Sequence, residues 1–231
     1  MQKSLAPFKI SPTLIYPTGP NRLSPKDIPG YEPSAAVAGD DEHGSETDAW
    51  AWWRKDEGTG EYRLLREGFE ALATAIREDA GGHVDGVVGF SQGGAMAALL
   101  AAALETEPQP RTPPSNSADY DWSWLQALRE ANGNQPLKFA VIYSGFFAPP
   151  DALGWLYEPK ISTPTLHFIG SLDTVVEESR SRNLVVRCED PMEVVHPGGH
   201  YVPVSREWAM PLVAFVKKRC EEDVEAARPM I

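Results

Sequence analysis

Hydrophobic residues follow two different periods along this chain, and together they predict strands that alternate with helices. Short apolar runs with β-branched or aromatic residues and little charge are typical of buried strands, and they occur at residues 86–90, 139–144, 165–170 and, more weakly, 192–195. Residues 13–16 form a further short strand candidate, closed by Pro17. This alternation predicts an α/β fold with a mostly parallel sheet covered by helices on both faces.

The helices are predicted from a 3.6-residue period or from length and composition. In residues 61–79 the apolar positions recur at i, i+4, i+7 and i+11, namely Leu65, Phe69, Leu72 and Ile76. Residues 95–104 are all apolar, which indicates a helix buried on every side. Further helices are expected at 119–131 and 204–220. The segments 17–49 and 105–118 are rich in proline and polar residues and are predicted to be loops.

A Gly-x-Ser-x-Gly motif, from Gly89 to Gly93, lies where the strand 86–90 meets the apolar helix. Such a turn holds its serine, here Ser91, in a strained conformation with Oγ above the sheet. We expect both flanking glycines to be required, because a Cβ at either position would crowd the turn. The first helix amides, beginning with the backbone N–H of Gln92, would face an oxyanion on an attacked carbonyl. The motif also occurs by chance in loops of small residues, so the partner residues decide its meaning.

A serine hydroxyl becomes a good nucleophile only when a base takes its proton. Three of the five histidines fit ordinary roles in a polar loop, a turn and a strand interior, namely His43, His83 and His167. His196 and His200 have an i, i+4 spacing that would suit a metal on a helix, but the Pro-Gly-Gly between them excludes a helix. His200 lies on this glycine loop between a late strand and the last helix. It is therefore predicted as the base, with His196 as a structural neighbour.

The base needs a carboxylate to fix its tautomer and to stabilise the imidazolium. Asp173 directly follows the strand 165–170 and is the best candidate, although it could instead cap a helix starting near Val175. Asp190 and Glu193 are nearer to His200 in sequence, but they precede or begin the next strand. The order serine, aspartate, histidine is that of the α/β-hydrolases.

Composition limits the remaining possibilities. The 231 residues fit a single α/β-hydrolase domain over 1–231, and a net charge of −12 argues against a nucleic-acid partner. Two cysteines give no disulfide framework, so a reducing compartment is expected. The N-terminus lacks the apolar core of a signal peptide, and the longest apolar run is too short to span a bilayer. We expect a cytoplasmic protein, with the nucleus as an alternative location, that uses no membrane, metal or cofactor.

Three indoles lie within four residues, at Trp50, Trp52 and Trp53. They could form a packed corner of the core, or an aromatic wall beside the entrance to the substrate site. The second alternative makes them candidate substrate-binding residues and favours an apolar acyl group.

Several segments together resemble the small eukaryotic serine hydrolases called FSH, the family of serine hydrolases. The resemblance extends over residues 5–216 and rests on DGVVGFSQGGAMAALL, VIYSGF, GSLDTVV and HPGGHYVP, together with the tryptophan-rich DAWAWW. It implies a triad of Ser91, Asp173 and His200 and a metal-independent esterase or thioesterase. Relatives include stand-alone thioesterases of fungal polyketide pathways in secondary metabolism. The expected substrate is therefore a small-molecule acyl ester or thioester, free or bound to a carrier.

One departure from the family pattern concerns the N-terminus. Members normally begin with a strand that ends in a His-Gly turn, and nothing here matches it. Either an N-terminally shortened sheet or a sheet that closes differently is therefore expected. That strand would lie beside the Ser91 strand, and its loop would supply a second oxyanion amide. Two hypotheses follow: a serine hydrolase that forms an acyl-enzyme with an apolar acyl group, or a catalytically impaired, hydrolase-like binding protein.

Overall fold

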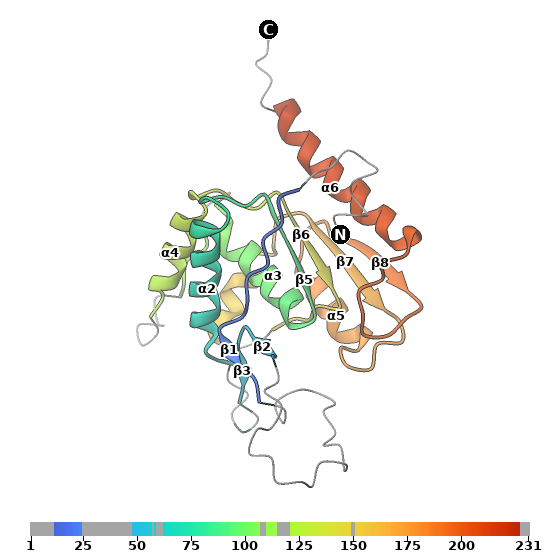
Figure 1. Ribbon diagram of the computed structural model, residues 1–231, viewed down its shortest axis with the longest axis horizontal. Coiled ribbons are helices and arrows are strands. Elements are labelled where there is room, and N and C mark those ends of the chain that lie inside the picture. Colours follow the sequence, from blue (N-terminus) through green and yellow to red (C-terminus); the bar gives the residue numbers. More distant parts are fainter. Residues whose placement is uncertain are drawn as a thin grey trace.

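A four-stranded parallel sheet forms the centre of the computed structural model (Figure 1). The structure describes residues 12–24, 48–56, 58, 62–106, 110–114, 121–148 and 151–226. The strand order follows the sequence, β5 (Gly86–Phe90), β6 (Phe139–Tyr143), β7 (Thr165–Gly170) and β8 (Met192–His196). The registers pair Phe90 with Tyr143, Tyr143 with Phe168, and Gly170 with His196, so all four carboxyl ends meet at one edge.

Helices cover both faces of this sheet, as the alternating side chains of β6 require. Ala140 and Ile142 belong to the core cluster that packs against α2 (Leu65–Glu78), α3 (Gln92–Leu104), α4 (Ser123–Ala131) and α5 (Glu178–Val185). Val141 and Tyr143 belong to a second cluster with Phe215 of α6 (Arg206–Ala226). The predicted α/β-hydrolase-type architecture is confirmed. None of the helices in the described residues is long and apolar enough to cross a membrane.

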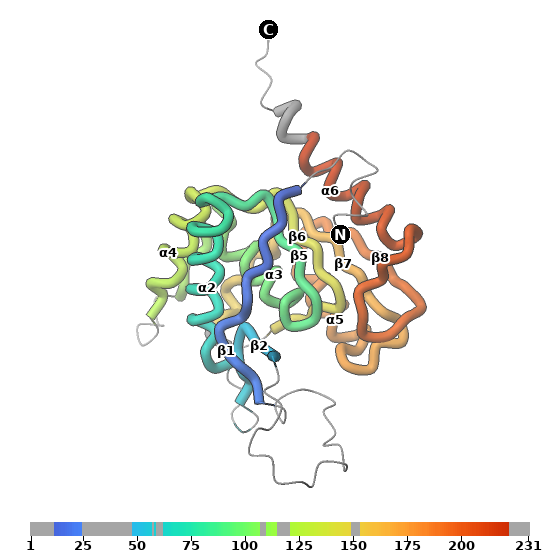
Figure 2. Tube along the Cα trace, in the orientation of Figure 1, coloured from blue at the N-terminus to red at the C-terminus, as the bar shows by residue number. Residues whose placement is uncertain are grey.

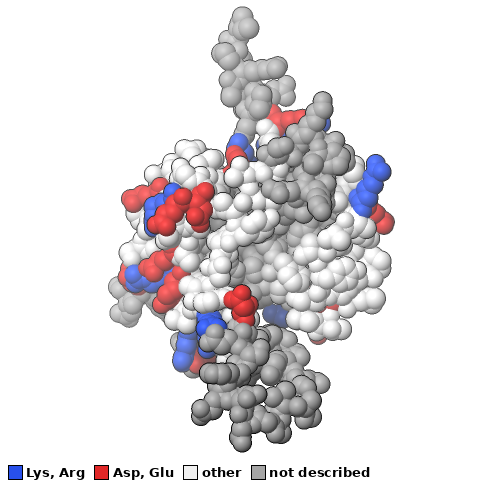
Figure 3. All heavy atoms as spheres, in the orientation of Figure 1, with Lys and Arg blue, Asp and Glu red and all other residues white. Residues whose placement is uncertain are grey.

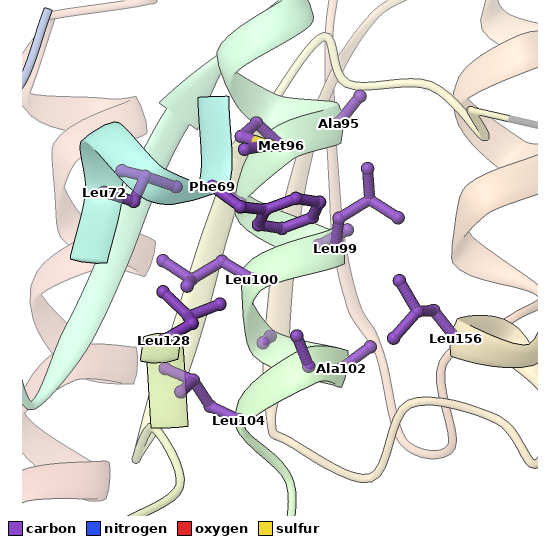
Figure 4. Close-up of a cluster of buried hydrophobic side chains, with 14 of the residues drawn as sticks. Phe69, Leu72, Ala95, Met96, Leu99, Leu100, Ala102, Leu104, Leu128 and Leu156 are labelled. Carbon is purple, nitrogen blue, oxygen red and sulfur yellow. The ribbon is translucent and has the colours of Figure 1, made fainter. Parts of the chain in front are cut away.

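The helix that follows the serine is buried on all sides. Every residue of α3 from Gly94 to Leu104 is buried. Figure 4 shows its side chains packed between α2, which contributes Phe69 and Leu72, and Leu128 of α4. The opposite side of α3 meets β5 and β6, so this helix is clamped between the sheet and a layer of two helices. The strand-to-helix turn at its start is therefore backed by the main core cluster.

Short two-stranded ladders precede the main sheet. β1 (Asn21–Arg22) pairs with β2 (Trp50–Ala51), and β3 (Arg54–Lys55) pairs with β4 (Tyr62–Arg63), both antiparallel. The predicted strand at 13–16 is wrong, because these residues run as irregular extended chain toward β1 (Figure 2). They hydrogen-bond to no strand of the described sheet, and flanking prolines further limit the donors available there. Residues 25–47 of the expected long loop, with His43, lie outside the described residues.

The strand that carries the nucleophile is an edge strand. The described residues add no strand beyond β5, and the side chains of Val88 and Phe90 on its α6-side face are exposed. In the view of Figure 3 the described surface between α2 and β8 carries few charges, whereas Asp, Glu, Lys and Arg gather over α2 and α4. Val88 and Phe90 thus present exposed apolar side chains on the strand that leads into the serine turn.

Two helical elements were not predicted from the sequence. α5 has a mostly polar sequence and buries only Ser181, Leu184 and Val185, so its period is hard to see. A 3₁₀ helix, η3 (Asp151–Tyr157), follows β6 and contributes Leu153 and Leu156 to the main core. Both fill the side of the sheet that α3 covers.

Candidate active site

Ser91 occupies a sharp turn between β5 and α3. Its φ of 54° and ψ of −119° lie in a region that residues with a Cβ rarely occupy, which marks backbone strain. Its N–H donates to the carbonyl oxygen of Tyr143 on β6 at 2.9 Å. The turn therefore holds the serine at the carboxyl end of the sheet and anchors it to the neighbouring strand.

The two glycines of the motif differ in what they require. A Cβ on Gly89 would lie 2.0 Å from the carbonyl oxygen of Gly93, a distance that no real structure accommodates. A Cβ on Gly93 would instead meet only Nε1 of Trp52, at an ordinary contact distance of 3.6 Å. The expectation that both glycines are required is right for Gly89 and wrong for Gly93, because the backbone crosses closely over itself only at the first position.

The structure brings together the three side chains that the sequence singled out. Nε2 of His200 lies 3.0 Å from Oγ of Ser91, and Nδ1 of His200 lies 2.8 Å from Oδ2 of Asp173. The three residues come from the turns after β5, β7 and β8, and 109 residues separate the serine from the histidine. The arrangement is a continuous hydrogen-bonded chain from a carboxylate through an imidazole to a hydroxyl, which is the geometry of a base-activated nucleophile.

Asp173 accepts hydrogen bonds on both carboxylate oxygens. The alternative role as a cap of a helix starting near Val175 is wrong, because residues 172–177 form no helix and α5 begins at Glu178. While Oδ2 accepts from His200, Oδ1 accepts from the backbone N–H groups of Val175 and Val176, both at 2.9 Å. Burial would raise the pKa of this carboxyl, but the hydrogen bonds from His200 and the two backbone groups outweigh burial and lower the pKa. The buried hydroxyl of Ser144, at the end of β6, acts in the same direction. The carboxylate is therefore ionised at neutral pH and fixed in orientation.

The start of α3 offers backbone amides beside the serine. The N–H groups of Gly94 and Ala95 donate to the carbonyl of Ser91, at 2.9 and 3.1 Å. Those of Gln92 and Gly93 come before them, and the first amides of a helix have no intrahelical acceptor. The Gln92 amide, directly after the nucleophile, is thus placed where the sequence predicts an oxyanion donor.

The three tryptophans have different surroundings. Trp53 is buried and stacks on Tyr62 with ring centroids 5.3 Å apart, as part of the core. Trp50 is exposed, and its Nε1 donates to Asp48 at 2.8 Å. Trp52 is half-buried and lies beside Gly93 at the start of α3. Trp53 thus fits the core-packing alternative, whereas Trp52 lies beside the turn that carries Ser91.

Exposed apolar side chains frame the histidine. The ring of Phe90 lies 4.7 Å from that of His200. Leu172 is 68% exposed and Tyr201 is 52% exposed, and the loops that carry them are joined by a bond from the Leu172 N–H to the Gly198 carbonyl at 3.0 Å. No signal in the sequence marked these residues, because loop residues show no periodicity.

His167, His196 and Cys188 have structural surroundings. His167 is buried with Nε2 3.1 Å from Oγ1 of Thr165, and burial lowers its pKa to about 4. His196 is buried against Tyr201 and Trp208, and burial lowers its pKa as well. Burial raises the pKa of the Cys188 thiol to about 11, which makes it a poor nucleophile. Within the described ranges, no group of three or more metal-ligating side chains occurs.

Comparisons with known proteins show which family the chain resembles. The family model described as serine hydrolase (FSH1) matches residues 1–212. The chain is 31% identical over 221 residues to family of serine hydrolases 2 of Saccharomyces cerevisiae, covering 91% of this chain and 86% of that protein. It is 32% identical over 194 residues to a dihydrofolate reductase of Schizosaccharomyces pombe, covering 82% of this chain but only 37% of that protein. Among solved structures, acyl-protein thioesterase 2 of Zea mays matches 73% of this chain and 72% of that chain, with 18% identity and a TM-score of 0.47.

Proposed function

Because the chain belongs to the serine hydrolase (FSH1) family, we propose that it hydrolyses an ester or thioester of an apolar acyl group through an acyl-enzyme. Ser91 is the nucleophile, His200 the general base and acid, and Asp173 the residue that orients His200. The observation that carries this proposal is the pair of hydrogen bonds, 3.0 and 2.8 Å long, that links the three side chains at a strained strand-to-helix turn.

Acylation begins with attack of Ser91 Oγ on the carbonyl carbon of the substrate. His200 Nε2 takes the hydroxyl proton, and the ionised Asp173 stabilises the imidazolium that forms. The backbone N–H of Gln92 donates to the oxyanion of the tetrahedral intermediate. When the intermediate collapses, the bond to the leaving alcohol or thiol breaks and the leaving group takes the proton from His200.

Deacylation repeats these steps with water as the nucleophile. His200 takes a proton from the water, which attacks the acyl carbon and restores an oxyanion near the Gln92 amide. Collapse then breaks the bond to Ser91 Oγ, which recovers its proton from His200 and releases the carboxylic acid. The proton balance closes within the same three side chains, so the proposed reaction needs no metal or cofactor.

The substrate class follows from the surroundings of the three residues. Leu172 and Tyr201, next to Asp173 and His200 in the chain, are exposed, and Trp52 lies beside Gly93 in the first turn of α3. An apolar acyl group would bury this surface. We propose a small-molecule ester or a thioester, free or bound to a carrier.

A fluorophosphonate probe tests the proposal directly. It should label the wild-type protein at Ser91 and leave the Ser91→Ala variant unlabelled, as read by mass spectrometry of the modified peptide. A folded wild-type protein that stays unlabelled would contradict the assignment of the nucleophile.

The edge position of β5 favours a second candidate, a hydrolase-like protein that binds a ligand without turning it over. In that case p-nitrophenyl butyrate would bind but would not be hydrolysed above the rate of the Ser91→Ala variant. Steady p-nitrophenol release that depends on Ser91 would exclude this candidate.

A further inference from the structure

The backbone of Trp52 is held against the start of α3 by the side chain next to the nucleophile. Gln92 Oε1 accepts from the N–H of Trp52 at 2.8 Å, and Gln92 Nε2 donates to the carbonyl of Trp53 at 3.0 Å. Since a backbone N–H only donates and a carbonyl only accepts, these bonds fix which end of the Gln92 amide faces each partner. The first residue of α3 thus has two contacts to a segment about 40 residues earlier in the chain.

A second side-chain amide holds the same peptide from another part of the chain. Asn21 is buried, and its Nδ2 donates to the carbonyls of Ala51 and Trp52, each at 3.1 Å. Helix α2 adds a third restraint, because a Cβ on Gly68 would lie 2.5 Å from the carbonyl oxygen of Trp52. Leaving such buried groups unpaired costs about 1–3 kcal/mol each. The main chain of Trp52 is therefore specified at its N–H, at its carbonyl and by direct helix packing.

These restraints bring the indole of Trp52 to the first turn of α3. Its Nε1 lies 3.6 Å from the point where a Cβ on Gly93 would be, two residues after Ser91. Because Trp52 is half-buried, protein covers part of the ring and the rest stays open to a ligand. A rigid indole of this kind offers a large apolar surface at little cost in conformational entropy.

Given the proposed hydrolase function, on which this step rests, we infer that Trp52 forms a wall of the acyl site and that Asn21 and Gln92 are positioning residues for it. The two amide side chains set the preference for acyl-chain length through Trp52. Asn21 and Gln92 thus affect binding of the acyl group, whereas Ser91, His200 and Asp173 carry out cleavage of the ester or thioester bond. Asn21 touches neither the nucleophile nor its base in the structure, so the two effects are separable.

The test is a series of p-nitrophenyl esters with acyl chains from two to eight carbons, measured on Trp52→Phe and Trp50→Phe. The two variants make the same chemical change in one segment, but only Trp52 lies beside α3. We expect Trp52→Phe to lower the ratio of kcat/KM for octanoate over acetate about tenfold, with the loss in KM, since about a methylene of apolar contact disappears. Trp50→Phe should keep the wild-type ratio.

Asn21→Ala and the near-isosteric Gln92→Met loosen Trp52 from two sides and should reproduce the tenfold loss. Asn21→Ala should also keep the wild-type kcat on acetate. The inference is overturned when Trp52→Phe keeps the ratio within twofold of wild type, or when Asn21→Ala lowers acetate and octanoate hydrolysis equally. Fluorophosphonate labelling of the same samples distinguishes failure of the proposed hydrolase function from failure of the inference about Trp52. Labelled wild-type protein with an unchanged ratio overturns this inference alone, whereas unlabelled and inactive wild-type protein overturns the proposed function and the inference with it.

Discussion

The two glycines of the Ser91 turn should respond differently to replacement by alanine: Gly89→Ala should lower the free energy of unfolding, and Gly93→Ala should leave it unchanged or raise it. At Gly89 the new Cβ would lie 2.0 Å from the carbonyl oxygen of Gly93 and 2.4 Å from its carbonyl carbon. At Gly93 the new Cβ would lie 3.6 Å from Nε1 of Trp52, and this position belongs to an ordinary helical turn. The same substitution at these two positions therefore tests whether the turn has no room for a Cβ at Gly89 while tolerating one at Gly93.

The size of each effect follows from these distances. Real Cβ contacts essentially never fall under 3.0 Å, so the Gly89→Ala backbone must separate by about 1 Å. Overpacking of this kind costs about 1–3 kcal/mol. A 1 Å shift of the elbow would also stretch the 3.0 Å contact between Ser91 Oγ and His200 beyond hydrogen-bonding range, and such misplacement can cost about 10² in rate. Gly93→Ala should instead gain about 0.4–1 kcal/mol, because alanine restricts the unfolded chain without strain in the helix.

Urea denaturation followed by far-UV circular dichroism measures both free energies of unfolding, and the rate of fluorophosphonate labelling reports on the elbow. We expect Gly89→Ala to have a lower urea midpoint and about 10²-fold slower labelling than the wild type. Gly93→Ala should have an unchanged or higher midpoint. Equal midpoints for the two variants would refute the steric argument. Wild-type labelling of Gly89→Ala would refute the link between this turn and the reactivity of Ser91.

Three further predictions concern buried polar groups. Asp173→Asn removes the carboxylate that orients His200, so kcat on an activated ester should fall by about 10⁴ with an unchanged circular dichroism spectrum; a loss under tenfold would exclude the assigned role. Burial lowers the pKa of His167 to about 4, below the ordinary value of about 6.5, so the unfolded chain binds the proton first as the pH falls. The free energy of unfolding in urea should therefore drop by about 2 kcal/mol from pH 7.5 to pH 5, and His167→Gln should lack this part of the dependence. Arg111 and Glu105 form a buried ion pair, so Glu105→Gln leaves Arg111 without a countercharge and should lower the free energy of unfolding by about 3–5 kcal/mol at pH 7.5 in the same assay. The double variant with Arg111→Met should recover most of this loss.

β6 and β7 could be predicted as buried strands because both of their faces are largely apolar. The expectation that residues 86–90 form a buried strand is wrong, because β5 lies at the edge of the described sheet and exposes Val88 and Phe90. β5 and β7 begin and end where the apolar runs do, and β6 ends one residue earlier than expected, at Tyr143. The helix after the serine begins at Gln92 rather than Ala95, since the geometry of the turn overrides the low helix propensity of two glycines. The prediction of a strand at residues 13–16 is wrong because a strand needs a partner strand, and the local sequence does not show whether one is available.

Ser91, Asp173 and His200 could be singled out from the sequence, because each follows a recognisable strand. The side chains that hold Trp52 could not. Asn21 and Gln92 contact backbone groups 30 to 40 residues away, and a bond from a side-chain amide to a distant peptide leaves no periodic trace. The sequence left open a role for Asp173 as the cap of a helix near Val175, whereas its Oδ1 accepts from two backbone N–H groups of a turn and its Oδ2 faces His200.

The edge position of β5 bears on the choice between an enzyme and a binding protein. The bonds that place the proposed catalytic residues come from the other side of the strand: Ser91 is tied to Tyr143 of β6, and a bond from Leu172 to Gly198 joins the loops that carry Asp173 and His200. The outer edge of β5 therefore affects what surrounds the carbonyl oxygen of a substrate rather than the alignment of the nucleophile and its base. Loss of one oxyanion donor slows a serine hydrolase by about 10²–10³, whereas an intact triad keeps the serine reactive. A chain with this geometry should thus label with fluorophosphonate even where its turnover is slow, and slow turnover alone would not make it a binding protein.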